Sequence, residues 1–349
     1  MAVPVSERVV EAVGEWSGRR PTMVDVAAAA GVSTALVSIV MRDVPGASAE
    51  TRHHVRRVAA ELGYVPDRRA QKLRQSRSGL IGVAFELQQP FQGDVVEQLY
   101  PAAAEGGYDL MLSGVVPTRG EVEAAEVLVR ERCEVVVLLG SRRAAASLDV
   151  LAERIPALVV ARPSGTPRVG AVRMDDIRGM RVAVDHLVGL GHRGILYIDG
   201  ADAPGAAERL TGFALGVAEH GLGDDAHVVP GGPSEPDGVR AMTAVLEGDR
   251  RRPTAVLAFN DRCAIGVLDV LLRRRIDVPG EVSVIGYDDS RLSRMDHIGL
   301  STVAQDAGRI AEEVVAQVVR RLDGGPPEDV VLAPSLVVRT TAGPVGGRS

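Results

Sequence analysis

Residues 22–66 carry apolar side chains at the three- and four-residue spacing of α-helices. Thr22 precedes the stretch "MVDVAAAA" and can cap a first helix, which Gly31 would end. This helix can face inward in two ways, through Val24, Ala27 and Ala28 or through Val26 and Ala30. The pattern predicts that a small helical domain begins at Thr22.

Two further helices are expected in the same segment. Ser33 can cap a helix that runs to Met41, and Ser48 can cap a third helix that ends near Gly63. The expected inward positions are Leu36, Val37 and Val40 in the second helix and Val55, Val58, Ala59 and Leu62 in the third. A helix, a short turn with glycine and a second helix are typical of a helix-turn-helix, whose second helix lies in the DNA major groove. An alanine-rich helical bundle without a DNA function would show the same pattern.

From Gly79 onward the pattern becomes an alternation of buried strands and helices. The expected strands are "LIGVAF" (80–85), "YDLML" (108–112), "VVVLL" (135–139), "ALVVA" (157–161), "GILYI" (194–198), "AVLAF" (255–259) and "VSVIGY" (282–287). Helix-like stretches of about 12 to 16 residues lie between them, as parallel sheets require. The segment is too long for one such domain, so an α/β architecture of two lobes with a cleft is expected.

Polar side chains follow several of these strands and two further strand ends, "AVRM" and "LSTVA", where open α/β sheets bind ligands. They are Asp175, Asp176, Arg209, Asn260, Asp261, Asp288, Asp289, Gln305 and Asp306. Carboxylates, a guanidinium and amides together offer the donors and acceptors that a polyhydroxylated ligand needs. Asp261 and Asp306 have a simpler interpretation as caps of the helices that follow them.

Composition adds a division of charge to this picture. The chain of 349 residues has a net charge of −6, yet residues 21–78 hold nine basic and five acidic side chains. A small basic module before a large acidic one suggests two functions. The two cysteines, Cys133 and Cys263, have no partners at metal-ligand spacing, so no disulfide, metal site or cofactor is expected. The N-terminus lacks the pattern of a signal peptide and no apolar run is long enough to span a membrane, so we expect a cytoplasmic protein.

Several ordered motifs resemble the lactose-repressor family of bacterial transcription regulators. They are "PTMVDVAAAAGVSTALVSIVMR", "SAETRHHVRRVAAELGYVPDRRAQKLRQSRSGLIGV", "DDIRGMRVAVDHLVGLGHRGILYI", "ERLTGF", "FNDRCAIGVLDVL", "VPGEVSVIGYDD" and "LSTVAQD". The resemblance covers residues 22–341 and implies a homodimeric, ligand-responsive repressor that binds a pseudo-palindromic double-stranded DNA operator. It implies an all-α helix-turn-helix domain followed by a two-lobed α/β effector domain like the type I periplasmic binding proteins.

The resemblance also implies domain boundaries. They are an N-terminal extension (1–21), the helix-turn-helix domain (22–66), a hinge helix (67–78), the effector-binding and dimerisation domain (79–341) and a tail (342–349). The lobe nearer the DNA would comprise 79–174 and 304–330, and the other lobe 175–303 and 331–341. The tail has no leucine heptad, so a tetramer built through it is not expected.

The DNA-binding residues follow from helix termini and from the resemblance. The helix N-termini at Thr22 and Ser33 suit phosphates, and Ser48, Thr51 and Arg52 match family positions that hold the DNA backbone. The expected reading face is Thr34, Ala35, Ser38 and Ile39, where Ile39 departs from the polar residue often found there. The hinge residues are Arg69, Ala70 and Leu73, of which Leu73 matches a leucine that enters the minor groove.

The effector-binding residues carry over in the same way. Arg209 and Asp288 match the pair that grips ligand hydroxyls, and the further matches are Phe91 with Gln89, Asp176, Asn260 and Gln305. The aromatic residue that often stacks on the sugar is replaced by Pro233 or Ser234 in "GGPSEPDG". A small sugar or sugar derivative is the expected effector, and a purine or other metabolite is the alternative.

Two other classes of protein would share parts of this pattern. An exported solute-binding protein would share the lobes, but it would need a signal peptide and has no use for residues 22–78. An enzyme could use Asp175–Asp176 and Asp288–Asp289 for acid–base or metal chemistry. Adjacent carboxylates point apart on a strand, and no nucleophile elbow, phosphate loop or metal-ligand set accompanies them. We therefore expect no enzymatic activity.

Overall fold

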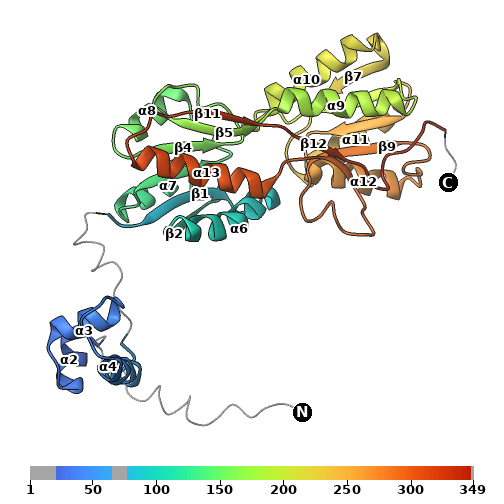
Figure 1. Ribbon diagram of the computed structural model, residues 1–349. Helices are drawn as coiled ribbons and strands as arrows, with labels where there is room; N and C mark the ends of the chain where they lie inside the picture. The colour runs from blue at the N-terminus through green and yellow to red at the C-terminus, as the bar shows by residue number, and fades with distance from the viewer. Residues whose placement is uncertain (1–20, 65–76, 347–349) are drawn as a thin grey trace, which may run out of the picture. The chain divides into compact units, whose positions relative to one another are not determined.

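The computed structural model describes residues 21–64 and 77–346 and divides the chain into two units, residues 1–77 and 78–349 (Figure 1). The predicted extension (1–21) and hinge (67–78) lie almost wholly outside the described residues.

In residues 21–64 of the first unit the structure describes three short helices, α2 (Met23–Ala30), α3 (Thr34–Met41) and α4 (Ala49–Glu61). Each begins at the predicted cap. The Thr22 backbone N–H and hydroxyl both donate to Asp25 Oδ2 at 2.7 Å, and the Ser33 and Ser48 hydroxyls each accept a backbone N–H three residues on. Such caps satisfy N–H groups that the first turn leaves unpaired.

The core of this unit consists of small apolar side chains. Its buried members are Val26, Ala27, Ala30, Val37, Val40, Val55, Val58 and Ala59. For α2 this selects the arrangement with Val26 and Ala30 inward, since the Val24 side chain is 64% exposed. The inward prediction for Leu62 is wrong, because α4 ends at Glu61 and Leu62 is its exposed C-cap.

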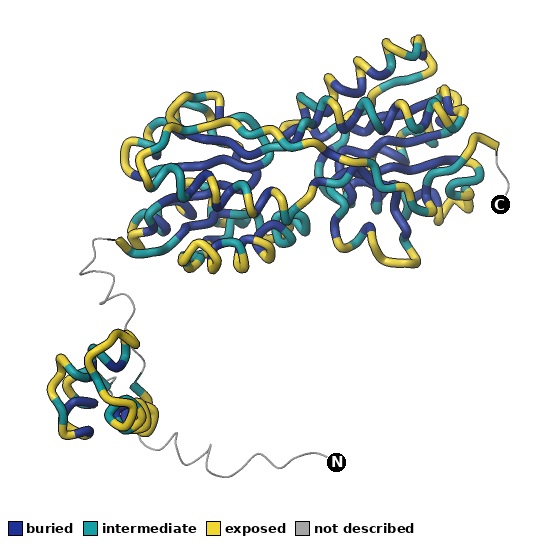
Figure 2. Tube along the Cα trace, in the orientation of Figure 1, coloured by how far each residue is buried: buried dark blue, intermediate teal, exposed yellow. Residues whose placement is uncertain are grey.

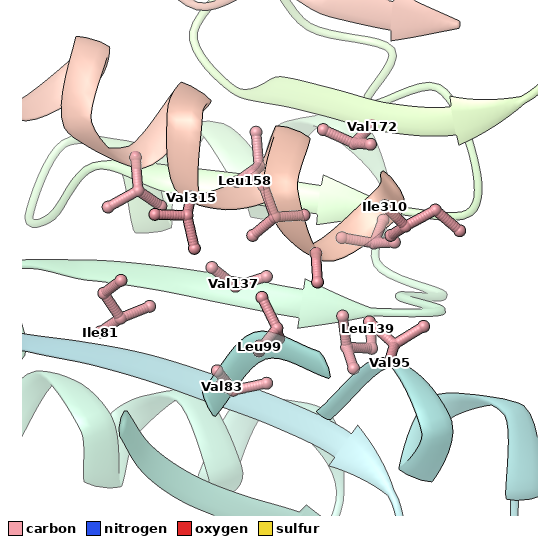
Figure 3. Packing of buried hydrophobic residues seen from close by; sticks show 14 of the residues in the cluster. Ile81, Val83, Val95, Leu99, Val137, Leu139, Leu158, Val172, Ile310 and Val315 are labelled. Atoms are coloured by element: carbon pink, nitrogen blue, oxygen red, sulfur yellow. The ribbon is translucent and has the colours of Figure 1, made fainter. Parts of the chain in front are cut away.

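The first lobe of the second unit is built on a six-stranded parallel sheet with the order β11-β5-β4-β3-β1-β2. The strands are β1 (Leu80–Glu86), β2 (Asp109–Val115), β3 (Val135–Leu139), β4 (Ala157–Val160), β5 (Gly170–Met174) and β11 (Asp329–Leu332). Helices α6 (Pro90–Glu105) and α13 (Ala307–Leu322) pack on one face, where Figure 3 shows Leu99 and Ile310 against the strands. Helices α7 (Glu121–Arg130) and α8 (Ala145–Ala152) cover the other face.

The second lobe has a sheet of the same size with the order β12-β10-β9-β8-β6-β7. Its strands are β6 (Ile195–Ile198), β7 (Ala226–Val229), β8 (Ala255–Ala258), β9 (Ser283–Asp288), β10 (Ser301–Ala304) and β12 (Ser335–Val337). Helices α9 (Asp176–Gly189) and α10 (Ala206–Glu219) cover one face, and α11 (Glu235–Glu247) and α12 (Asp261–Arg273) cover the other. Figure 2 shows the buried strands of both sheets between helices whose outer sides are exposed.

The chain passes between the two lobes after β5, after β10 and after β11. Each lobe is therefore assembled from separate stretches of sequence. The loops that leave the carboxyl ends of both sheets line one cleft, which is where an open α/β sheet binds ligands.

Among residues 21–64 and 77–346, no single helix is long and apolar enough to cross a membrane. The bent pair formed by α2 and α3 passes that test by length and composition only.

Helices α11 and α12 approach each other closely through two glycines. A β-carbon on Gly266 would lie 2.1 Å from the Glu235 carbonyl oxygen, and one on Gly238 would lie 2.1 Å from the Cys263 carbonyl oxygen. Because a real β-carbon cannot come that close to backbone, the packing of this face depends on glycine at both positions.

We predict that Gly266→Ala lowers the free energy of unfolding by about 2–3 kcal/mol, because α12 must move away from α11. The matched control is Gly189→Ala at the end of α9, where a β-carbon would meet no atom within 4 Å. This control should leave stability unchanged or raise it by up to about 1 kcal/mol. Chemical denaturation measures both, and equal effects would contradict the close-approach argument.

Candidate functional site

The N-terminal end of α3 presents small, uncharged side chains. Thr34 and Ala35 are exposed, whereas Ser38 and Ile39 are half-buried. The Cδ1 and Cγ2 atoms of Ile39 lie 3.5 Å from the position that a β-carbon would take on Gly46. Ile39 therefore packs on the loop between α3 and α4, and the most accessible part of the expected reading face is Thr34 and Ala35.

The beginning of α4 is held by side-chain contacts within the unit. The hydroxyls of Ser48 and Thr51 lie 2.8 Å apart. Arg52, whose side chain is only 20% exposed, donates to Asp43 Oδ1 at 3.0 Å and to the Val44 carbonyl at 2.5 Å. Arg52 thus fastens the loop that joins α3 to α4. The predicted hinge residues Arg69, Ala70 and Leu73 lie outside the described residues.

The cleft between the two lobes brings together five of the six predicted effector-binding residues. They are Phe91, Arg209, Asn260, Asp288 and Gln305, and Gln89 lines the cleft with them. The empty space in the cleft is about 620 Å³, and this volume includes the part that is open to solvent. The sixth predicted residue, Asp176, does not line the cleft and instead pairs with Arg209.

The guanidinium of Arg209 is the centre of the polar network in the cleft. Its Nε donates to Asp176 Oδ1 at 2.9 Å and its Nη1 donates to the Phe259 carbonyl at 2.7 Å. The guanidinium carbon also lies 3.6 Å from the ring centroid of Tyr287 and 4.7 Å from that of Phe259. Two aromatic rings and two oxygen acceptors thus fix the orientation of one buried cation.

Burial and charge act in opposite directions on this ion pair. Burial raises the pKa of Asp176, and the neighbouring Arg209 charge opposes that rise. Burial alone would lower the pKa of Arg209, but the carboxylates of Asp176 and Asp288 more than offset it and raise that pKa. Both side chains are 5% exposed. Removing either one would leave a buried charge without its partner, which is strongly destabilising.

Asp288 ends β9 and faces the cleft beside Arg209. Its Oδ1 accepts from Gln305 Nε2 at 2.6 Å and lies 3.9 Å from Arg209 Nη2. Burial, above all, raises the pKa of Asp288 to about 8. Its φ of 117°, followed by a φ of 54° at Asp289, is uncommon for residues other than glycine. Backbone of this kind persists where neighbouring contacts fix it, often at binding sites.

Asn260 lines the cleft and also acts as a helix cap. Its Oδ1 accepts from the Cys263 N–H at 2.9 Å, and its Nδ2 donates to the Pro233 carbonyl at 3.1 Å. The prediction that Asp261 caps this helix is therefore wrong. Asp261 is buried and accepts from the Thr302 hydroxyl at 2.6 Å and the Ser290 N–H at 2.7 Å.

The other predicted cap, Asp306, is confirmed. Its Oδ1 accepts from the Arg309 N–H at the start of α13 at a distance of 3.0 Å.

Several side chains that line the cleft were not predicted from the sequence. They include Glu86, Gln92, Arg142, Pro204 and Phe259. Phe259 could have been found, because it directly precedes Asn260 at a strand end, whereas nothing local in the sequence distinguishes Arg142. Arg142 Nη1 donates to Asp202 Oδ1 at 3.1 Å and so joins the two lobes. Pro233 lines the cleft near the place where the family often carries a stacking aromatic residue.

The described residues contain no group of three or more histidine, cysteine, aspartate or glutamate side chains that could hold a metal ion. Both cysteines are free and buried, and burial raises the pKa of Cys133 to about 11 and that of Cys263 to about 12. A thiol with a raised pKa is a poor nucleophile.

Comparison with known proteins matches both units. Residues 22–67 match the family described as "Bacterial regulatory proteins, lacI family", and residues 184–342 match the periplasmic binding protein-like domain. The HTH-type transcriptional regulator GalR of Escherichia coli is 34% identical over 91% of this chain and 94% of that protein.

Two solved structures extend this similarity. The crystal structure of a LacI transcriptional regulator from a Rhodococcus species is 55% identical, with a TM-score of 0.75 over 76% of this chain and 99% of that one. The lac repressor dimer bound to operator and the anti-inducer ONPF is 30% identical, with a TM-score of 0.79 over 93% of this chain and 99% of that one. The similarity thus spans the helical unit and both lobes. The chain belongs to the lacI family of bacterial regulatory proteins, which regulate transcription and are not enzymes.

Proposed function

We propose that this protein is a repressor that binds a pseudo-palindromic operator as a homodimer and whose operator affinity is changed by a small molecule in the cleft. The observation that carries this proposal is that one chain combines a capped helix-turn-helix with exposed Thr34 and Ala35 and a two-lobed unit with a polar cleft centred on Arg209. The lac repressor, with its dimer, operator and anti-inducer, supports each part. Such a regulator acts in the cytoplasm, where its operator is.

The DNA contacts proposed for this chain are of two kinds, contacts to the phosphate backbone and contacts to the bases. The helices capped by Thr22, Ser33 and Ser48 present backbone N–H groups at their N-termini, and such groups can bind phosphates. Thr34 and Ala35 can bond a base edge or contact a thymine methyl group, but neither makes the bidentate contact with guanine that arginine makes. We propose that Leu73, with its neighbours Arg69 and Ala70, bends the DNA and so adds to sequence preference. An inserted apolar side chain favours base steps that deform easily.

The proposed effector is a small sugar or sugar derivative. The guanidinium of Arg209, the carboxyl of Asp288 and the amide of Gln305 offer alternating donors and acceptors at one end of the cleft. Phe91, Phe259 and Pro233 supply apolar surface for the non-polar faces of a ring. The amide of Asn260 already bonds the Cys263 N–H and the Pro233 carbonyl. We therefore propose that Asn260 positions the cleft wall as well as contacting the ligand.

Selection of bound duplexes from a random DNA library, with and without a mixed pool of sugars, tests this function. We expect enrichment of a palindrome with a deformable central step in one condition and its loss in the other. No enrichment in either condition would contradict operator binding. Equal enrichment in both would contradict a switch operated by sugars.

The substitution Asp288→Asn should raise stability while weakening effector binding. The pKa of Asp288 in the folded protein, about 8, lies above the ordinary pKa of an aspartate, 3.8. The stability that its protonated form contributes is present below pH 4 and is lost as the pH rises towards 8. The advantage of the variant, which has no proton to lose, should therefore grow from pH 5 to pH 8 and reach about 1–2 kcal/mol.

Thermal or chemical unfolding at several pH values measures this effect. The control is Asp289→Asn, because Asp289 Oδ1 accepts from Arg339 Nη2 at 2.6 Å and its loss should lower stability. If Asp288→Asn is less stable than the wild type at pH 8, the electrostatic account of the cleft is wrong.

A further inference from the structure

Helix α3 itself contains no charged residue, and the first charged group of the segment directly follows its C-terminal end. Arg42 is the C-cap residue of α3 and is exposed. Its Nε donates to the Ser38 carbonyl at 3.2 Å, which lays the side chain along the end of the helix. This bond leaves the two terminal nitrogens of the guanidinium for another partner.

The remaining arginines of residues 21–64 are all paired with carboxylates of the same unit. Arg52 and Arg56 both bind Asp43 Oδ1, at 3.0 and 2.7 Å, and Arg57 binds Glu61 at 2.7 Å. Within the part of the chain that the structure describes, Arg42 has no carboxylate partner. Its positive charge is therefore the one in this stretch that no nearby acid neutralises.

The carboxylate next to Arg42 in sequence does not cancel that charge. Asp43 directs Oδ1 towards Arg52 and Arg56. Two arginines on one carboxylate leave this end of α3 with a net positive character, because Arg42 adds a third cation. A polyanion that approaches this end would not have to displace an existing ion pair of Arg42.

We propose that Arg42 binds a phosphate of the DNA backbone and holds the C-terminal end of α3 against it. This inference rests on the proposed operator binding. In a helix-turn-helix the N-terminal residues of the second helix contact the base edges, so a cation at the opposite end is placed for the backbone. The terminal nitrogens of a guanidinium suit two oxygens of one phosphate.

The assignment separates two functions along one helix. A phosphate contact fixes position and adds affinity but carries no sequence information. Arg42 thus contributes equally on operator and non-operator DNA, while discrimination between sequences depends on Thr34 and Ala35. This explains how a recognition helix with an uncharged reading end can be held on a polyanion.

Operator binding by the full chain, titrated over a range of salt concentrations, tests the proposal. The variant Arg42→Gln keeps the length of the side chain and removes its charge. Its plot of log K against log salt should be shallower than the wild-type plot by about 0.9, the value for one phosphate contact. Its affinity should fall by a similar factor on operator and on random duplex.

Two controls complete the design. Arg57→Gln makes the same change of net charge at a residue paired with Glu61, and it should keep the wild-type slope. Arg42→Lys retains a cation that binds phosphate and should restore the slope.

A wild-type slope for Arg42→Gln would overturn the proposal, as would a loss of affinity confined to operators with one particular base. Failure of the wild-type protein to bind any selected duplex would instead refute the proposed operator binding itself.

Discussion

The second unit depends on the burial of one positive charge. Arg209 lies on α10, yet its partners come from the start of α9, the end of β8 and the end of β9. An isolated cation in this position would be very costly, and its partners must therefore stay in place around it. The same contacts that make the charge tolerable also hold Arg209 and Asp288 in the lining of the cleft. These contacts thus stabilise the lobe and position the side chains of the site.

The first unit is held together by a much smaller core than the second. In residues 21–64 the buried core contains only valine and alanine side chains, and each of the three described helices begins at a hydroxyl cap. The Arg52 and Asp43 contacts add a fixed loop between α3 and α4. At the beginning of α3, the side chains of Thr34 and Ala35 remain exposed to solvent. Direct contact with base edges requires exposed side chains on a rigid frame.

Sequence patterns predicted the elements whose signals are local. The three caps and the strands β1, β2, β3, β4, β6, β8 and β9 were found from hydroxyl residues and buried apolar runs. The strands β7, β11 and β12 were missed because they lie at sheet edges and are half-exposed, so they contain no buried run. The strands β5 and β10 were recognised only as the strand ends "AVRM" and "LSTVA", because Arg173, Ser301 and Thr302 interrupt their apolar pattern.

The candidate site was predicted in its residue types but not in its geometry. Strand ends and the family resemblance pointed to Arg209 and Asp288. That Asp176 lies behind Arg209 and not in the cleft could not be read from sequence, because the pair is 33 positions apart and meets only through the packing of α9 on α10. The exchange of roles between Asn260 and Asp261 has the same cause, since the partners of Asp261 lie on distant segments.

The central claim is that the cleft and the DNA-binding face are coupled. The most direct test is calorimetric titration of the sugar that alters duplex selection, first onto the free protein and then onto its operator complex. Linkage requires the sugar affinity to differ between the two states by the same factor by which the sugar changes operator affinity, at least about 5-fold for a useful switch. Equal sugar affinity in the two states would contradict the account.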